Sequence, residues 1–340
     1  MRLPGRHSRS RCGQASLRTV RVTTAARPSL PAFVWRVRKL IWWRRGSSEI
    51  TDRSSFGSTP STIRHLRLGV LEILSLLIAA GLAPLFYWRL LTTNPEDAAT
   101  LPSGDFTDLN YPYRRWVAEQ LARGVEPYWN QFVSAGHSAV GDIQFRIFYP
   151  PENWLASLGG SNFSVRLFEI GVVGHIAFAV VVTYLLARRL SRSRVGGLVS
   201  AVVFGFGGYL SGFPVQQTNV LEASVWLPFA LLCVELGTDY GSPAGFAAGA
   251  GALGLSALAG HPQTFLYALI TTICYALYKS WCHGRIRLTP LLGTILIGLG
   301  SVALAAIALL PAYLHLALTD RATAAYDFTK GGFALHEIVG

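Results

Sequence analysis

The feature that most constrains the fold is a series of long apolar stretches separated by short polar ones. A helix needs about 20 mostly apolar residues to cross the roughly 30 Å hydrocarbon core of a bilayer. Because lipid cannot satisfy backbone polar groups, such stretches fold as helices. Seven stretches approach this length: 68–91, 167–186, 196–213, 220–236, 244–259, 264–281 and 288–310. We therefore predict an all-α integral membrane protein with about seven transmembrane helices.

The composition agrees with a membrane protein and excludes a soluble one. Hydrophobic residues make up 51% of the chain and charged residues only 14%, against about 25% charged residues in soluble domains. The net charge of +12 is concentrated in the first 67 residues, which hold 15 Lys and Arg and 2 acidic residues. The basic balance therefore describes a tail and not a nucleic-acid-binding body.

The tail, residues 1–65, is rich in Arg, Ser and Thr. Such a composition buries too little apolar surface to fold alone, so we predict disorder, followed by a polytopic membrane domain over 66–340. Residues 33–45 interleave aromatic and basic side chains, which suits a helix on anionic lipid. The alternatives are a solvated arm or an incorrectly chosen start codon.

The distribution of Lys and Arg among the short loops predicts the orientation of the helices. The basic tail and the loops 188–194, 237–245 and 279–287 are expected on the cytoplasmic side, and two of these three loops are densely basic. The outside loops are then 92–166, 214–219, 260–263 and 311–340. The N-terminus should accordingly be cytoplasmic.

The long loop 92–166 should carry function, because long loops between short turns are usually functional. Within residues 112–123, apolar side chains recur at the spacing of an amphipathic helix: Tyr113, Trp116, Val117 and Leu121. Asn110 or Asp108 could cap this short interfacial helix, and Gly124 could end it. Residues 126–155 lack a regular period and are expected to form ordered irregular backbone.

Polar side chains gather on the predicted outer side of the membrane. The candidates are Asp105, Asp108, Asn130, His137, Asp142, Gln144, Arg146, Gln216, Gln217, Asn219, His261, Gln263, Asp320 and Arg321. Convergence of polar groups from several loops predicts a binding or catalytic site. The four cysteines lack the spacing of a zinc site, and no acidic or histidine-rich cluster indicates a metal.

Each candidate also has a purely structural interpretation. Asp105 and Asp108 could be helix caps, and His137 and His261, which follow glycines, could satisfy turn backbone. Asp142 could be the i, i+4 partner of Arg146. These alternatives stay open at this point.

Several of these residues occur in motifs that resemble the bacterial YfhO-like membrane proteins. The motifs are Gly104-Asp105-Phe106 with Asp108, Tyr111 and Pro112; Trp129-Asn130; Ala135-Gly136-His137; Asp142-Ile143-Gln144; Phe148-Tyr149-Pro150-Pro151; Trp226-Leu227-Pro228; and Gly260-His261-Pro262-Gln263. The resemblance spans residues 68–321. Members of that family are usually longer, so the resemblance implies that this chain is an N-terminal fragment.

The YfhO-like family is similar to the GT-C glycosyltransferases, which take sugars from polyprenyl-phosphate carriers in the bacterial cytoplasmic membrane. The resemblance implies a catalytic Asp105 with Asp108 as its neighbour. Cationic side chains would hold the phosphate: Arg114, Arg115, Arg146, His137, His261 and Arg321. Asn130, Asp142, Gln144 and Gln263 would contact substrate. No cofactor is implied; a divalent cation is compatible with the two carboxylates but not indicated.

The implied partners are a polyprenyl-phosphate-linked sugar, membrane lipid and a cell-envelope acceptor, without nucleic acid. Two other functions remain open: a transporter or flippase for a lipid-linked saccharide, and a non-catalytic membrane subunit. Transporters usually place polar groups at the bilayer midplane on interrupted helices. The polar candidates here lie at the predicted outer ends of the helices, which favours the enzyme.

Overall fold

The computed structural model describes residues 61–212, 216–281, 288–319 and 322, all of which belong to the second of two compact units, residues 52–340. Within the described part, the regular secondary structure is helical apart from one pair of two-residue strands. Predictions for residues 1–60, and for Asp320 and Arg321, lie outside the described residues. Helix α2 already includes residues 61–65, which the sequence had assigned to the tail.

Among the residues that the structure describes, five helical segments are long and apolar enough to cross a membrane. They are α2 (Ser61–Phe86), α6 (Val165–Ser191), α7 (Arg194–Phe206) with α8 (Gly208–Ser211), α9 (Thr218–Ser224) with α10 (Leu227–Tyr240), and α13 (Leu288–Leu316). The prediction of a multi-pass, all-α membrane protein agrees with these helices. The other two predicted crossings correspond to α11 (Pro243–Leu258), which is shorter, and α12 (Pro262–Trp281), which is not among these five.

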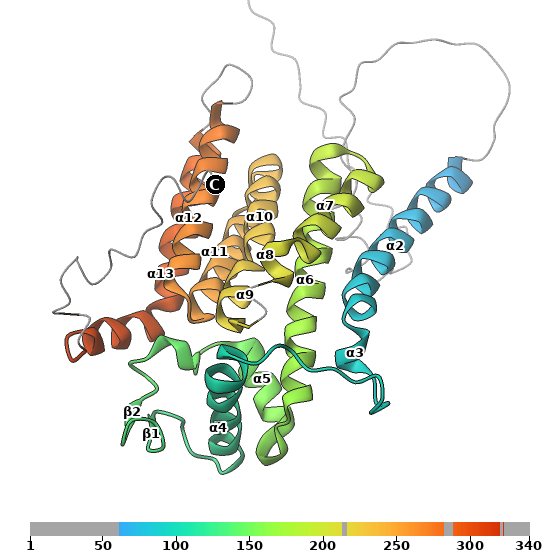
Figure 1. Cartoon of the computed structure of the whole chain (residues 1–340). Helices are drawn as coiled ribbons and strands as arrows, with labels where there is room; N and C mark the ends of the chain where they lie inside the picture. Colours follow the sequence, from blue (N-terminus) through green and yellow to red (C-terminus); the bar gives the residue numbers. More distant parts are fainter. Residues whose placement is uncertain (1–60, 213–215, 282–287, 320–321, 323–340) are drawn as a thin grey trace, which may run out of the picture. The chain divides into compact units, whose positions relative to one another are not determined.

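The helices pack through small residues. In Figure 1, α6, α10, α11 and α13 run side by side, and α11 packs against both α10 and α13. At Gly293 of α13, an added Cβ would lie 2.1 Å from Cε1 of Phe246 in α11. Close approach through glycine is the usual way in which membrane helices gain packing contact.

Ion pairs join the ends of helices that the sequence predicted to be cytoplasmic. Arg189 of α6 contacts Asp239 at 2.6 Å and Glu235 at 3.7 Å, both on α10, and Lys279 of α12 lies 2.8 Å from Glu235. Glu72 of α2 pairs with Arg188 and Arg194 at 3.3 and 3.0 Å. The acidic residues at the end of α10 therefore balance the basic residues that end α6 and α12.

The long loop 92–166, which the sequence predicted to lie outside, is folded. The short helix α3 (Trp88–Leu91) precedes it. The loop contains the π-helix η1 (Phe106–Asn110), α4 (Tyr111–Ala122), β1 (Trp129–Asn130), β2 (His137–Ser138), the 3-10 helices η2 (Ile143–Phe145) and η3 (Gly160–Asn162), and α5 (Pro150–Gly159). The two strands are antiparallel, with Trp129 opposite Ser138 and Asn130 opposite His137. Helix α4 lies within one residue of the predicted 112–123 helix at each end.

The predicted spacing correctly identified the buried face of α4. Trp116 and Val117 form a small core with Phe145 and Ile147, and Tyr113 stacks on the Phe145 ring at 3.7 Å. The predicted caps were wrong: neither Asn110 nor Asp108 caps α4, because the chain enters α4 directly from η1. The first backbone N–H groups of α4 therefore already belong to a helical turn.

Candidate functional site

Asp105 precedes η1, and its carboxylate is exposed. Its Oδ2 accepts a hydrogen bond of 2.7 Å from Nε2 of Gln217, the residue before α9. A carboxylate oxygen only accepts, so this contact fixes which end of the Gln217 amide faces Asp105. The contact joins residues 112 positions apart. The prediction that Asp105 and the 216–219 turn converge is therefore confirmed for Gln217.

Asp108 lies in a different environment, although it is also exposed. Its Oδ1 accepts a 2.8 Å hydrogen bond from the hydroxyl of the adjacent Thr107. Thr107 in turn donates to the carbonyl of Gly104 at 3.1 Å. Asp108 thus makes local contacts within η1, whereas Asp105 makes a contact across the fold.

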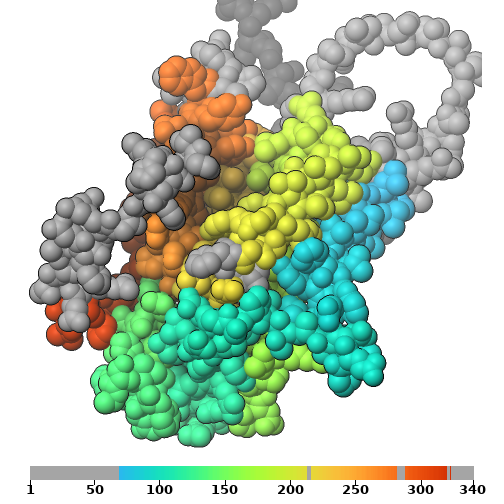
Figure 2. All heavy atoms as spheres, viewed as in Figure 1, coloured from blue at the N-terminus to red at the C-terminus, as the bar shows by residue number. Residues whose placement is uncertain are grey.

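Asn110 holds the backbone on both sides of the Asp105–Gln217 contact. The side chain is buried, and its Nδ2 donates to the carbonyl of Asp105 at 2.9 Å and to that of Gln216 at 3.3 Å. Its Oδ1 accepts a 3.1 Å hydrogen bond from Nη2 of Arg146. In Figure 2 the teal atoms of this part of the loop abut the yellow atoms at the beginning of α9.

Arg146, which donates to Asn110, belongs to a cluster of buried charges. The cluster consists of Arg114 of α4, Arg146 after η2, Glu152 of α5 and Glu222 of α9. Arg114 approaches Glu152 at 2.6 Å, and Arg146 approaches Glu152 at 3.4 Å and Glu222 at 2.9 Å. No side chain of the four is more than 2% exposed. Two cations and two carboxylates make the cluster formally neutral, which is what such burial requires.

The arginines of the cluster also donate hydrogen bonds to neutral groups. Arg114 donates to Oδ1 of Asn153 at 3.0 Å and to the carbonyl of Phe145 at 2.8 Å. Arg146 donates to the hydroxyl of Thr218 at 2.9 Å. Neither oxygen of Glu152 meets hydrogen-bond geometry, but the carboxylate lies close to the guanidinium groups of Arg114 and Arg146.

The charges shift one another's pKa in the directions that burial and pairing dictate. Burial raises the pKa of Glu152, but Arg114 and Arg146 lower it by more, so the pKa lies below its usual value. For Arg146, burial lowers the pKa, and Glu152 and Glu222 together raise it above normal. Arg114 has one near carboxylate and a neighbouring cation, so burial prevails and its pKa is lowered.

Three uncharged side chains form a separate hydrogen-bonded chain, and one of them, Tyr149, follows Arg146 by three residues. Nδ1 of His175 lies 2.8 Å from the Gly171 carbonyl and must carry the proton, which leaves Nε2 to accept from the Tyr149 hydroxyl at 2.8 Å. The same hydroxyl accepts from Nε1 of Trp226 at 3.1 Å. Burial and the nearby Glu222 raise the pKa of Tyr149 well above its ordinary value, so its hydroxyl keeps its proton.

The structural alternative in which Asp142 pairs with Arg146 does not hold, because Asp142 has other partners. Oδ2 of Asp142 lies 3.0 Å from Nε2 of His137, and Oδ1 accepts from the backbone N–H of Gln144 at 2.9 Å. The His137 ring lies between Phe145 and His315, with centroids 5.8 and 5.7 Å away. Because α13 extends to Leu316, beyond its predicted end at 310, His315 reaches this group.

The Gly260-His261-Pro262-Gln263 motif forms the entry to α12. Gly260 has φ +83°, and a Cβ there would lie 2.5 Å from Cγ of Arg146. Nδ1 of His261 accepts from the backbone N–H of Thr264 at 3.2 Å and contacts the Thr264 hydroxyl at 2.6 Å. His261 thus satisfies backbone at a helix start, the structural alternative, while Gln263 donates to the exposed Tyr267 hydroxyl at 2.6 Å.

The remaining predicted residues are dispersed. Asn130 is buried, and its Oδ1 accepts from the Phe132 N–H at 2.9 Å within the hairpin. Arg115 is exposed and pairs with Glu119 at 3.0 Å. The predicted phosphate ligands Arg114 and Arg146 have no exposed side-chain surface and are already paired with carboxylates.

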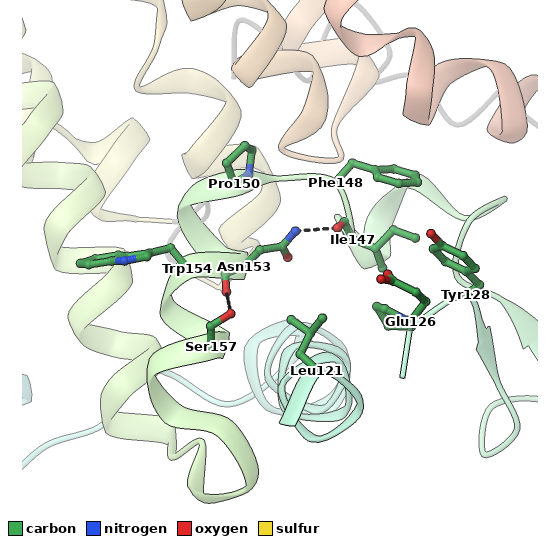
Figure 3. A pocket seen from close by; sticks show the side chains of 10 residues that line it. Leu121, Glu126, Tyr128, Ile147, Phe148, Pro150, Asn153, Trp154 and Ser157 are labelled. Atoms are coloured by element: carbon green, nitrogen blue, oxygen red, sulfur yellow. Dashed lines mark hydrogen bonds between the residues drawn. The ribbon is translucent and has the colours of Figure 1, made fainter. Parts of the chain in front are cut away.

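A pocket of about 390 Å³ lies between α4, α5 and the segment that leads into β1. Figure 3 shows Leu121, Glu126, Tyr128 and Ile147 around it, with Asn153 donating to the carbonyl of Ile147. Asn153 also accepts a hydrogen bond from Arg114, so one side chain both lines this pocket and contacts the buried cluster. The lining residues include neither Asp105 nor Gln217.

The sequence analysis missed Glu152 and Glu222. The signal for Glu222 was present, since an ionisable residue inside an apolar stretch invites a functional or structural explanation. Within the described ranges, no group of three or more His, Cys, Asp or Glu side chains is arranged to hold a metal ion. No protein-family model, curated protein or solved structure matches this chain.

Proposed function

We propose that this protein is a bacterial cytoplasmic-membrane glycosyltransferase that moves a sugar from a polyprenyl-phosphate carrier to a cell-envelope acceptor on the outer side. The observation that carries the proposal is the exposed Asp105 carboxylate, which is held at the start of a folded loop by the side chain of Gln217, the residue before α9. A general base needs both access to substrate and a defined position.

The proposed reaction transfers one proton and one glycosyl group. A carboxylate oxygen of Asp105 takes the proton of the acceptor hydroxyl while the acceptor oxygen forms a bond to the anomeric carbon. The bond from that carbon to the phosphate oxygen breaks, and the polyprenyl phosphate leaves with the electron pair. Oδ1 of Asp105 is suited to the proton transfer, since Oδ2 is engaged with Gln217.

The leaving phosphate needs a cation, and Arg115 is the most accessible of the predicted arginines that the structure describes. Its side chain is 55% exposed, and its i, i+4 pair with Glu119 is a surface contact of the kind that contributes little. Arg115 can therefore leave Glu119 for a phosphate. Arg114 and Arg146 are better suited to holding the loop than to binding substrate, because their charges are already compensated.

The transporter alternative draws on Glu222, a buried carboxylate within a segment long enough to cross the membrane. Its pairing with Arg146 gives it a structural explanation that requires no transported ion. We therefore favour the transferase.

Reconstitution separates the two functions. Vesicles that contain the purified chain are supplied with a radiolabelled polyprenyl-phosphate sugar and an extract of cell-envelope lipids and glycans. A transferase produces label in a new glycosidic bond, which resists the mild acid that cleaves the sugar phosphate. Movement of intact donor across the vesicle membrane without any new glycoside would contradict the proposal and favour transport.

A further inference from the structure

Gln217, a half-buried residue, reaches Asp105 with its side-chain amide. Its backbone carbonyl accepts from the N–H groups of Val220 and Leu221 at the start of α9, a role that any residue could take. Its side chain makes one hydrogen bond among the described residues, to Oδ2 of Asp105 at 2.7 Å. The neighbouring Gln216 contributes a backbone carbonyl to Asn110.

We infer that Gln217 is a positioning residue for the proposed reaction, and this inference rests on the proposed role of Asp105. The amide holds one carboxylate oxygen and leaves the other to face the acceptor hydroxyl. Because the amide is neutral, it orients the carboxylate without adding a cation that would compete for it. Asn110 of η1 donates to the backbone carbonyl of the same aspartate. Asp105 is therefore held at its carboxylate by the residue before α9 and at its main chain by η1.

This arrangement couples the site to the buried charges. Arg146 donates to Asn110, and Asn110 donates to the carbonyls of Asp105 and Gln216. Two hydrogen bonds thus hold the turn that carries Gln217 against the η1 region: one from the Gln217 side chain to Asp105, and one from the Asn110 side chain to the Gln216 carbonyl. The precision of such positioning matters, because small misplacements of a catalytic group reduce the rate strongly.

The test is a double-mutant cycle on the full chain in vesicles, with kcat and KM measured by transfer from the labelled donor. The variants are Asp105→Asn, Gln217→Ala, the double variant, and Gln217→Glu, which keeps the shape but replaces the donor with a like charge. Gln216→Ala is the matched control, since the Gln216 side chain makes no hydrogen bond within the described part of the chain.

We expect Gln217→Ala and Gln217→Glu to lower kcat about tenfold or more, as loss of a hydrogen bond to a charged group does. KM for the donor and the melting temperature should stay close to those of the parent. The double variant should be no slower than Asp105→Asn alone, since positioning has no value without the base.

Three results would overturn the inference. If Asp105→Asn is inactive but Gln217→Ala keeps kcat within about threefold of the parent, positioning fails and the proposed function stands. If the double variant loses a further factor equal to that of Gln217→Ala, Gln217 acts independently of Asp105. If Asp105→Asn itself is as active as the parent, both the inference and the proposed base fail.

Discussion

Arg146 of the long loop 92–166 and Glu222 of α9 form an ion pair with Nη1 and Oε2 2.9 Å apart, and neither side chain is more than 1% exposed. The two residues are 76 positions apart in the sequence. Since Arg146 also contacts Asn110, Thr218 and Glu152, this pair joins the loop that carries Asp105 to a segment long enough to cross the membrane.

Removal of Arg146 should destabilise the protein strongly. Arg146→Met leaves Glu222 buried without its partner, and breaking a buried pair in this way costs about 3–5 kcal/mol. The melting temperature in detergent should fall, and Arg146→Met/Glu222→Met should recover part of the loss. Arg115→Ala, an exposed arginine on the same loop, is the control and should melt as the parent does. An unchanged melting temperature for Arg146→Met would show that the pair does not hold the loop.

Gly260 should tolerate no side chain. At φ +83° an alanine is strained, and its Cβ would lie 2.5 Å from Cγ of Arg146 and 2.7 Å from the carbonyl oxygen of Ile143. We expect Gly260→Ala to cost at least about 1–3 kcal/mol. Gly251→Ala in α11 is the matched control, because no atom lies within 4 Å of its added Cβ. Equal stability of the two variants would contradict the close approach of Gly260 to Arg146.

His261 should make stability depend on pH. Burial lowers its pKa from 6.5, so the unfolded chain binds the proton more readily than the folded one. Stability should therefore be highest at neutral pH and above, and should decrease as the pH falls below about 6.5. Protonation of Nδ1 also removes the acceptor for the Thr264 N–H.

The measurement for His261 compares melting temperatures at about pH 7.5 and 5.5 in the parent and in His261→Asn. Asparagine keeps a cap acceptor without a titrating group. The variant should lose part of the difference in melting temperature between the two pH values. A difference as large as that of the parent would mean that His261 does not titrate with folding.

The predicted orientation of the chain can be tested with cysteine variants after the four native cysteines are replaced by serine. Phe132→Cys lies in the predicted outside loop at a side chain that is 75% exposed, and Ala244→Cys lies at the exposed start of α11, in a predicted inside loop. An impermeant thiol reagent should label Phe132→Cys in intact cells and Ala244→Cys only after lysis. The reverse pattern would invert the topology.

Local features of this fold could be predicted from the sequence, because they depend on spacing within one element. The apolar stretches identified the long helices, and the recurrence of Trp116, Val117 and Leu121 identified α4 and its buried face. Helix α5 was missed, because Pro150 and Pro151 were interpreted as irregular backbone. Proline is favourable at the first positions of a helix, which is where the two residues lie.

The charged cluster could not be predicted, because it is a tertiary arrangement. Arg146 and Arg114 appeared as free cations on an outside loop, and only the fold brings Glu222 and Glu152 to them. Asp142 precedes Arg146 by four residues, a spacing that would pair the two side chains on a helix. The backbone at Arg146 is left-handed, with φ +52°, so the two residues are not on one helix. Asp105 and Gln217 were both candidates, but their contact depends on the docking of η1 against α9.

The central claim is that the Asp105 carboxylate is the base of a glycosyl transfer, and Asp105→Asn tests it most directly. Asparagine keeps the size of the side chain and a carbonyl oxygen that can accept from Gln217, so the fold should be retained. Loss of a general base reduces the rate about 100- to 10,000-fold, so transfer from the labelled polyprenyl-phosphate sugar should fall by at least about two decades, while Asp108→Asn should lose much less. A transfer rate for Asp105→Asn within about threefold of the parent would contradict the account.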